Sequence, residues 1–537
     1  MPSNKKYILL LNSLSLQVWQ RDALQILKQE ELATPVLIIV NNISSLKPSF
    51  FQKIKQYPFK NFLFRFWKRY FLNVPAQEIV PLPDFLKNTP VEYVETISIG
   101  KHKEKFPDAA LDIMNKAQAD FIIRFGFNIL TGDVLHICKG GILSYHHGHE
   151  KNYRGGPPGF WEIVNRENTT SVVLQRLGEK LDAGTILAKR SLLSIKHSYS
   201  AQLHRLLMES TDMIAQVLRK ENSGYLPSDL QPINTYPNNF QFLKYLYYSN
   251  AEKIKIRYQQ IFKKEKWNFA LARLNGLDIE PISGPLFPDK AGEYAADCFV
   301  WTKENKTYVV YEYYTYSQKK GSILLSEISD NKLINTKVLL ENETHFAYPF
   351  LFEHENKLYV APENLESGKW NAYELNLETG KVSNPITLIN EPLVDASILE
   401  HENKYYVFAG LPKQANEALH IWYSDSIWGP YQKHPLCPVV YNPSSARMGG
   451  NFVHLNGEIF RPAQKSDIHY GEAIVWKKIK KLSNTQFEEE EFNTQYNTFF
   501  KEFDAGMHTV SHHKQICVID FKKHQSDKKS VVSHFSK

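Results

Sequence analysis

Apolar and polar positions follow two different patterns along this chain. From residue 1 to about residue 220, short apolar runs such as Tyr7–Leu11, Val36–Val40 and Phe121–Phe125 alternate with segments of helical periodicity such as Val18–Lys28. Strands that alternate with helices are typical of a parallel sheet covered by helices. The first 220 residues are therefore predicted to form an α/β domain.

The pattern changes after residue 220. A turn-rich stretch leads into the helix-like segment Phe240–Phe262, and we predict a helical connector over 221–285. Over 286–525, short β-rich runs are separated by turns about every ten residues, which indicates an all-β domain. The basic end, 526–537, is predicted to be a disordered tail.

The β-rich part contains an internal repeat of one template: strand, polar turn, strand. Its aromatic markers Tyr308, Tyr359, Tyr406 and Phe460 are spaced by 51, 47 and 54 residues, and Ser511–Ile519 supplies a weaker fifth copy. A period near 50 with about four strands per unit is typical of propeller blades. We therefore predict a five-bladed β-propeller.

Composition limits the functional classes. A length of 537 residues predicts roughly two to four domains, and the net charge of +7 among 64 basic and 57 acidic residues gives no reason to expect nucleic-acid binding. The four cysteines form no CxxC pair, so neither a metal site nor a disulfide framework is predicted. The apolar run near Met1 is too short for a signal peptide, and we expect a cytoplasmic protein.

The densest group of chemically active residues in the first domain runs from Gly140 to His149. The predicted strand there ends in two histidines, which places His146 at the carboxyl end of a parallel sheet, where ligand sites form. An acid such as Asp182 beside it would orient the ring and stabilise its charged form. The alternative is that the histidines are ordinary loop residues and that Asp182 forms a turn.

The spacing of Ser144, His146, Arg154-Gly155 and Asp182-Ala-Gly resembles that of folate-dependent formyltransferases, a family that includes methionyl-tRNA and sugar-nucleotide N-formyltransferases. The resemblance implies that His146 carries the proton and that Asp182 is its partner. Ser144 stands where the family has an Asn that donates to the oxyanion, and losing such a donor costs on the order of 3 kcal/mol. Asn128 or Asn152 could compensate.

The same resemblance implies that 10-formyltetrahydrofolate is the cofactor. The segment that looks like the folate-pocket strand and loop consists of Phe125, Gly126, Phe127, Asn128, Ile129 and Leu130.

In the second domain, acidic and polar residues fall near predicted strand starts. Inner strands of consecutive blades converge, so Asp297, Glu363 and Asp395, with Arg461 nearby, could face a shared funnel suited to glycosidic chemistry. The alternative is that they are turn and cap residues. The order of motifs from Ala296-Asp-Cys to Arg461-Pro-Ala-Gln resembles the propeller domain of plant glucosamine inositolphosphorylceramide transferases, with Cys298 replacing a usual proline.

The segment 59–71 mixes seven aromatic residues with four basic ones. It could make peripheral contact with a membrane or a lipid-linked acceptor, or it could be an amphipathic helix packed on its own domain.

Together these patterns favour a transferase: formyltransferase-like transfer of a one-carbon acyl group to an amino sugar, a sugar nucleotide or a glycolipid precursor, with a propeller that binds or processes carbohydrate. One alternative is glycosyltransferase or glycosidase activity in the propeller, with a non-catalytic first domain. Another is a non-enzymatic carbohydrate-binding protein, which the replacement of Asn by Ser144 would favour.

Overall fold

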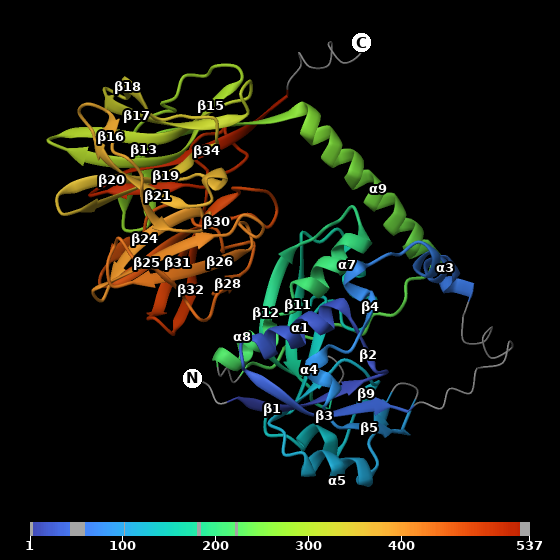
Figure 1. Cartoon of the computed structure of the whole chain (residues 1–537). Helices are drawn as coiled ribbons and strands as arrows, with labels where there is room; N and C mark the ends of the chain where they lie inside the picture. The colour runs from blue at the N-terminus through green and yellow to red at the C-terminus, as the bar shows by residue number, and fades with distance from the viewer. Residues whose placement is uncertain (1–3, 43–58, 101–102, 180–183, 221–223, 527–537) are drawn as a thin grey trace. The chain divides into compact units, whose positions relative to one another are not determined.

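The computed structural model describes residues 4–42, 59–100, 103–179, 184–220 and 224–526 (Figure 1). The chain divides into two compact units, Met1–Lys255 (unit 1) and Ile256–Lys537 (unit 2). Apart from Ser526, which ends the last strand, the predicted tail lies outside the described residues. No described helix has the length and apolar character needed to cross a membrane.

Unit 1 is built on a seven-stranded sheet in the order β12-β11-β10-β8-β1-β3-β5. Its strands are β1 (Lys5–Leu11), β3 (Ala33–Asn41), β5 (Val91–Val94), β8 (Phe121–Arg124), β10 (Ile142–His147), β11 (Thr169–Arg176) and β12 (Thr185–Leu193). Five neighbouring strands are parallel, as predicted, whereas β11 pairs antiparallel with both β10 and β12. The connection between β11 and β12 is too short for the crossover that a parallel pair requires.

Helices cover both faces of this sheet. The helices of this part of the chain are α1 (Val18–Gln29), α3 (Phe62–Tyr70), α4 (Asp84–Lys87), α5 (Asp108–Lys116), α6 (Phe160–Val164), α7 (Tyr199–Met208) and α8 (Met213–Lys220), followed by α9 (Asn239–Phe262), which begins against α6 and α7. Ile142 of β10 packs in one core cluster with Met114 of α5, while Tyr145 contacts Trp19 of α1 with a ring-centroid distance of 5.3 Å. Successive side chains of β10 therefore serve opposite faces, as strand geometry requires.

Short elements complete unit 1. Two small sheets pair β2 (Ser15–Gln17) with β4 (Ile79–Pro81), and β6 (Ile97–Ser98) with β7 (Lys103–Lys105) and β9 (Ile129–Leu130). Three 3-10 turns are η1 (Phe59–Asn61), η2 (Pro75–Gln77) and η3 (Asp133–His136).

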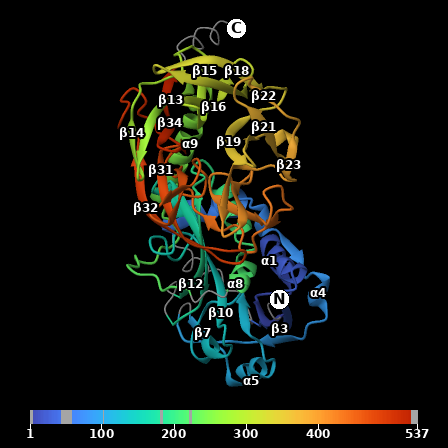
Figure 2. The same ribbon diagram turned by 90° about the vertical axis from the view of Figure 1, so that its left-hand side faces the viewer.

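Unit 2 is all-β, and its described residues form five sheets of four or five strands. Four of these sheets follow one another along the chain. The first contains β15 (Glu293–Lys303), β16 (Lys306–Thr315), β17 (Lys320–Ser329) and β18 (Lys332–Leu340), and the second contains β19 (Ala347–His354), β20 (Lys357–Glu363), β21 (Trp370–Asn376), β22 (Lys381–Val382) and β23 (Ile386–Ile389). The third contains β24 (Val394–His401), β25 (Lys404–Gly410), β26 (Ala418–Ser424), β27 (Gln432–Lys433) and β28 (Val440–Tyr441), and the fourth contains β29 (Val453–Leu455), β30 (Glu458–Lys465), β31 (Ala473–Leu482) and β32 (Phe487–Tyr496). Figure 2 shows β31 and β32 side by side. Each of the first four repeat copies found in the sequence therefore begins one sheet.

The fifth sheet joins the two ends of unit 2. It contains β13 (Lys263–Asn275), β14 (Asp278–Pro281), β33 (Val510–His513) and β34 (Ile516–Ser526), and β13 pairs with β34 along its length (Figures 1 and 2). The first strands of unit 2 thus pair with its last strands. This pairing leaves fewer backbone N–H and C=O groups unpaired at the edge of the sheet.

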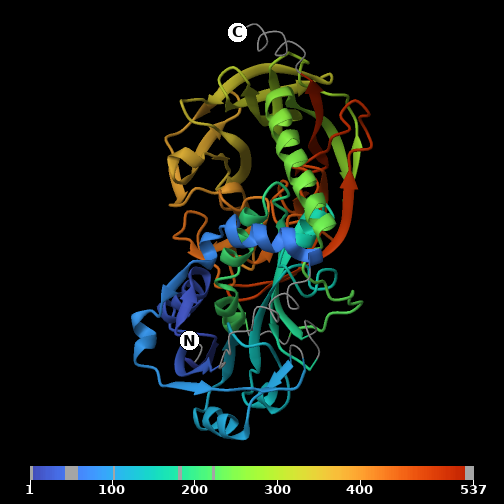
Figure 3. The same cartoon turned by 90° about the vertical axis from the view of Figure 1, so that its right-hand side faces the viewer.

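These strands correct the predicted helical connector over 221–285. Figure 3 shows α9 as one long helix, but it ends at Phe262, and residues from Lys263 onward form strands. The physical reason is long-range: Trp267, Phe269 and their neighbours are buried against β34, a partner that no local pattern reveals.

Candidate functional site

The three predicted acids of unit 2 lie in one buried cluster. Asp297, Glu363 and Asp395 are 5%, 8% and 1% exposed. The backbone N–H of Asp395 donates to Oε2 of Glu363 over 3.1 Å, and the Asp395 charge acts on both other carboxyls. The structure thus brings the three together, and it places them within β15, β20 and β24 rather than in turns.

Three sheets position their cluster residues with the same backbone device. Asp297, Tyr348 and Asp395 have φ angles of 50°, 41° and 48°, and each lies at a register shift near the start of β15, β19 or β24. Such angles are unfavourable for residues other than glycine, by on the order of 1–3 kcal/mol, and they concentrate at functional sites. The bulge re-aims each side chain away from the normal alternation of the strand.

The second strand of each sheet supplies another set of polar groups. Counting four residues past the aromatic marker of each of the first four copies gives Glu312, Glu363, Gly410 and Gln464. The three polar members of this set are buried, and so is Asp520 of β34. Glu312 and Asp520 were not among the predicted residues, although the spacing of the repeat would have identified Glu312.

The buried charges are compensated within the cluster. Asp395 accepts from Nε of Arg447 at 2.5 Å, from a second Arg447 nitrogen at 3.4 Å, and from Nε2 of Gln464 at 2.8 Å. Asp520 accepts three backbone N–H bonds, from Asp297, His508 and Thr509, at 2.9 to 3.1 Å. Charge-assisted bonds of this kind are what allow carboxylates to remain buried as anions.

The same surroundings give the carboxyl groups of Glu363 and Asp297 different pKa values. Burial, reinforced by the Asp395 charge and opposed by Arg447, raises the pKa of Glu363 to about 8. Burial, opposed by His508 and reinforced by Asp395 and Asp520, raises the pKa of Asp297 to about 6. At neutral pH, Glu363 can therefore donate a proton and Asp297 can accept one, and such a pair indicates an acid–base site.

One group of described residues has the arrangement of a metal site. Ligand atoms of Asp297, His508 and Asp520 lie within 4.8 Å of one another. However, His508 already bridges the two acids, with Nδ1 2.7 Å from Asp520 and Nε2 3.4 Å from Asp297. Burial lowers the pKa of His508, but the two carboxylates outweigh this and raise it, so a protonated imidazole can occupy the place of a cation.

Arg461 is engaged differently from the acids with which it was grouped. Its guanidinium pairs with Glu489 at 2.7 and 2.9 Å and donates to the Ser445 carbonyl at 2.7 Å. Glu489 belongs to β32, so the acidic run 488–491 is part of a strand. The contacts of Arg461 connect β30 with β32, which is a positioning role.

In unit 1, His146 and Ser144 both lie on β10 and are buried. Asp182, the predicted partner of His146, falls outside the described residues. The Ser144 hydroxyl accepts a hydrogen bond at 3.0 Å from Arg124, the last residue of β8. The neighbouring His147 bonds Ser210 at 3.1 Å, and burial, with the adjacent His146, lowers its pKa to about 3, so it stays neutral.

The predicted folate-binding segment, residues 125–130, is held in place by contacts within the protein. Arg124 donates to the carbonyls of Phe127 and Asn128 at 3.0 and 2.9 Å, and the N–H of Asn128 donates to Glu104 at 2.5 Å. Phe127 and Leu130 belong to the hydrophobic core. These contacts fix the backbone of the segment, and folate binding by it stays a prediction.

Glu162 of α6 is a further buried acid, and no sequence pattern had indicated it. It is fully buried, and its Oε1 accepts from the His149 N–H and the Thr170 hydroxyl, each at 3.1 Å. Burial raises its pKa to about 7. A Cβ at Gly148 would lie 3.4 Å from Nε2 of His146 and 3.5 Å from Oε1 of Glu162, so the two side chains border the same small space beside this glycine.

Comparison with known proteins supports this division. Residues 82–217 match the formyl transferase family, and residues 287–528 match the family described as glucosamine inositolphosphorylceramide transferase 1, N-terminal. Each part resembles a different family. Both resemblances proposed from the sequence are thereby confirmed.

Individual relatives cover only part of the chain. A glucosamine inositolphosphorylceramide transferase 1 from Oryza sativa subsp. japonica is 27% identical over 226 residues, which are 39% of this chain and 30% of the rice protein. The bifunctional polymyxin resistance protein ArnA of Wigglesworthia glossinidia brevipalpis is 35% identical over 98 residues, 18% of this chain and 15% of that protein. Among solved structures, the family 117 glycoside hydrolase Zg3597 of Zobellia galactanivorans aligns with a TM-score of 0.33 at 11% identity, covering 48% of this chain and 90% of that chain.

The raised pKa of Glu363 makes a prediction about stability. Between the ordinary carboxyl value and pH 8, the folded protein keeps a proton on Glu363 that the unfolded chain has released. The free energy of unfolding should therefore fall as the pH rises from about 5 to 8. Thermal unfolding of Glu363→Gln across this range should show a shallower decline than the wild type, and equal slopes would contradict the assignment.

Proposed function

We propose that unit 2 is a five-bladed propeller whose central acids form or break a glycosidic bond. The observation that carries this proposal is the split between two carboxyls of one buried cluster, with the pKa of Glu363 raised to about 8 and that of Asp297 to about 6. Five sheets in chain order and the match of residues 287–528 support the propeller and its association with sugars.

Each acid has a distinct role in this proposal. Neutral Glu363 donates its proton to the departing glycosidic oxygen as the carbon–oxygen bond breaks, and the carboxylate of Asp297 takes a proton from the attacking hydroxyl. Asp395 is a positioning residue: both of its oxygens are held by Arg447, and its charge keeps Glu363 protonated. The rice relative's name suggests a glucosamine-bearing glycolipid as the product class.

Removing the proton donor should abolish this activity. We expect Glu363→Gln and Asp297→Asn to lower kcat/KM by about 10²–10⁴ on a panel of 4-nitrophenyl glycosides that includes the glucosaminide, with product identified by mass spectrometry. Glu343→Gln, an exposed acid of the same unit, is the matched control. Full activity in Glu363→Gln would refute the assignment.

Asp395→Asn tests the positioning role of Asp395. It should move the alkaline limb of the pH–rate profile to lower pH, because the charge that raises the pKa of Glu363 is gone.

A second candidate is transfer of a one-carbon acyl group to an amine at His146, supported by the match of residues 82–217 to formyl transferases. Here His146 would accept the proton that the amine loses as the new carbon–nitrogen bond forms, and would return it to the donor nitrogen as the bond from that nitrogen to the acyl carbon breaks. Ser144, held by Arg124, would face the reacting carbonyl oxygen. The two activities would serve the same end, the assembly of an amino-sugar glycan or glycolipid.

The second candidate is tested by measuring transfer of a labelled formyl group to an amino sugar. The full-length protein is incubated with formyl-labelled 10-formyltetrahydrofolate and glucosamine, and the product is read by mass. His146→Asn should reduce transfer by about 10²–10⁴, while His197→Asn, in an outer turn of the same unit, should leave it unchanged. Transfer that is equal in both variants would place the chemistry elsewhere.

We also propose that α3 contacts an anionic membrane surface. Phe64 and Trp67 pack inward with Phe242, but an aromatic stripe stays outside, made of Phe59, Phe62, Phe66, Tyr70 and Phe71 at 82%, 50%, 46%, 64% and 67% exposure. The segment 59–71 holds four basic residues and no acidic one. Exposed aromatics beside cations suit insertion among anionic headgroups.

Vesicle sedimentation tests this contact. The double variant Phe62→Ser with Phe66→Ser should bind phosphatidylglycerol-containing vesicles at least about tenfold more weakly than wild type, because two aromatic side chains no longer leave water. Leu226→Ser, which removes an apolar side chain 71% exposed elsewhere in unit 1, should have no effect. Undiminished binding in the double variant would exclude α3 as the contact.

A further inference from the structure

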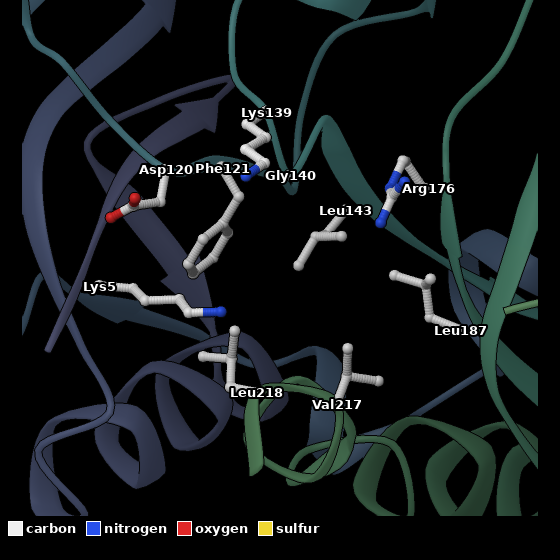
Figure 4. Close-up of a pocket in the computed structure, with 10 residues that line it drawn as sticks. All are labelled: Lys5, Asp120, Phe121, Lys139, Gly140, Leu143, Arg176, Leu187, Val217 and Leu218. Atoms are coloured by element: carbon white, nitrogen blue, oxygen red, sulfur yellow. The ribbon is translucent and has the colours of Figure 1, made fainter. Parts of the chain in front are cut away.

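Unit 1 contains a cavity of about 420 Å³ that the proposed reactions do not use (Figure 4). It lies at the amino-terminal edge of the sheet, where Lys5 begins β1 and Phe121 begins β8. His146 is near the opposite end of β10. Leu143 lines the cavity, and because side chains alternate along a strand, Ser144 points to the other face. The cavity is therefore separate from the candidate acyl-transfer site.

The floor of this cavity is apolar and mostly aliphatic. It is formed by Phe121, Leu143 and Leu187 of the sheet and by Val217 and Leu218 of α8. Four of the five are aliphatic, so the walls suit an alkyl chain better than a stacked heterocycle. A cavity of this volume lies within the range of small-molecule sites.

Three cations border the same space: Lys5, Lys139 and Arg176. Figure 4 shows the nitrogen atoms of Lys5 and Arg176 directed into it. Within the described part of the chain, none of the three cations forms an ion pair or a side-chain hydrogen bond, and the Nε atom of Arg176 is buried without an acceptor. Asp120, the acid at the rim, already accepts a hydrogen bond at 2.7 Å from the backbone N–H of Lys6.

The position of Arg176 depends on a glycine. Gly141 has a φ of 68°, and a Cβ there would lie 2.8 Å from Cγ of Arg176. The absence of a side chain at residue 141 lets the arginine stem lie flat across the start of β10. A guanidinium held in place by its stem is preorganised for a planar or tetrahedral oxyanion.

We propose that this cavity binds an amphiphile with a single aliphatic chain and an oxyanion head, either phosphate or carboxylate. Arg176 binds the head, and the chain lies over Leu143, Leu187 and Val217. The charge of the rim and the composition of the floor complement the two ends of such a molecule.

Isothermal titration of the full-length protein with octyl phosphate tests the proposal. We expect saturable one-site binding, weaker by at least about tenfold in Arg176→Gln, because charged hydrogen bonds are lost. Val217→Trp, which fills the cavity from the half-buried side of α8, should abolish binding even if Arg176→Gln fails to fold. Lys116→Gln, a charge removal on α5, is the matched control and should bind as the wild type does.

Further ligands test separately whether the cavity recognises the oxyanion head and whether it recognises the aliphatic chain. Inorganic phosphate and octanol should each bind far more weakly than octyl phosphate, and octanoate shows whether a carboxylate can replace the phosphate. Binding of octanol as tight as that of octyl phosphate would overturn the role of the cations. Tighter binding of adenosine monophosphate would overturn the aliphatic assignment, and no binding of octyl phosphate, or binding unchanged in Val217→Trp, would overturn the site.

Discussion

Burial of carboxyl groups is the constraint that organises unit 2. Asp297, Glu312, Glu363, Asp395 and Asp520 are all removed from water, and burying a carboxylate is expensive unless it is paired and hydrogen-bonded. The protein meets this cost with Arg447, Gln464, His508 and backbone N–H groups that converge from several sheets. Because the compensation is uneven, one acid keeps its proton and another gives it up, which is the basis of acid–base chemistry.

The strained backbone and the charge cluster belong to the same arrangement. Three left-handed residues at equivalent positions aim Asp297, Tyr348 and Asp395 inward. The Tyr348 hydroxyl then accepts from the N–H of Gly450 at 2.8 Å and also contacts Ser397 at 3.0 Å, which links the sheets of β19 and β24 to the segment that precedes β29. Strain of this kind persists only when the surroundings over-determine it, and here the pairing of the sheets does so.

Unit 1 shows how a shared framework can be altered locally. In the formyltransferase resemblance, Ser144 replaces an amide donor, and in the structure its hydroxyl is bound by Arg124. The same guanidinium holds the carbonyls of Phe127 and Asn128, so one side chain fixes both the serine and the segment that is expected to bind folate. A domain that matches a family over 136 residues, from 82 to 217, can therefore differ from it in the contacts around one key position.

The sequence alone determined the two-part division, the α/β and all-β classes, and the repeat that places Glu363 and Asp395 in successive sheets, because periodicity and spacing are local properties of the chain. It could not reveal the pairing of β13 with β34, the ion pair of Arg461 with Glu489, or Arg124 on Ser144, which join residues that are distant or unremarkable in the chain. The proton affinities of the acids were also decided only by tertiary structure. A carboxyl's pKa depends on which charges and how little water surround it, and only folding sets those surroundings.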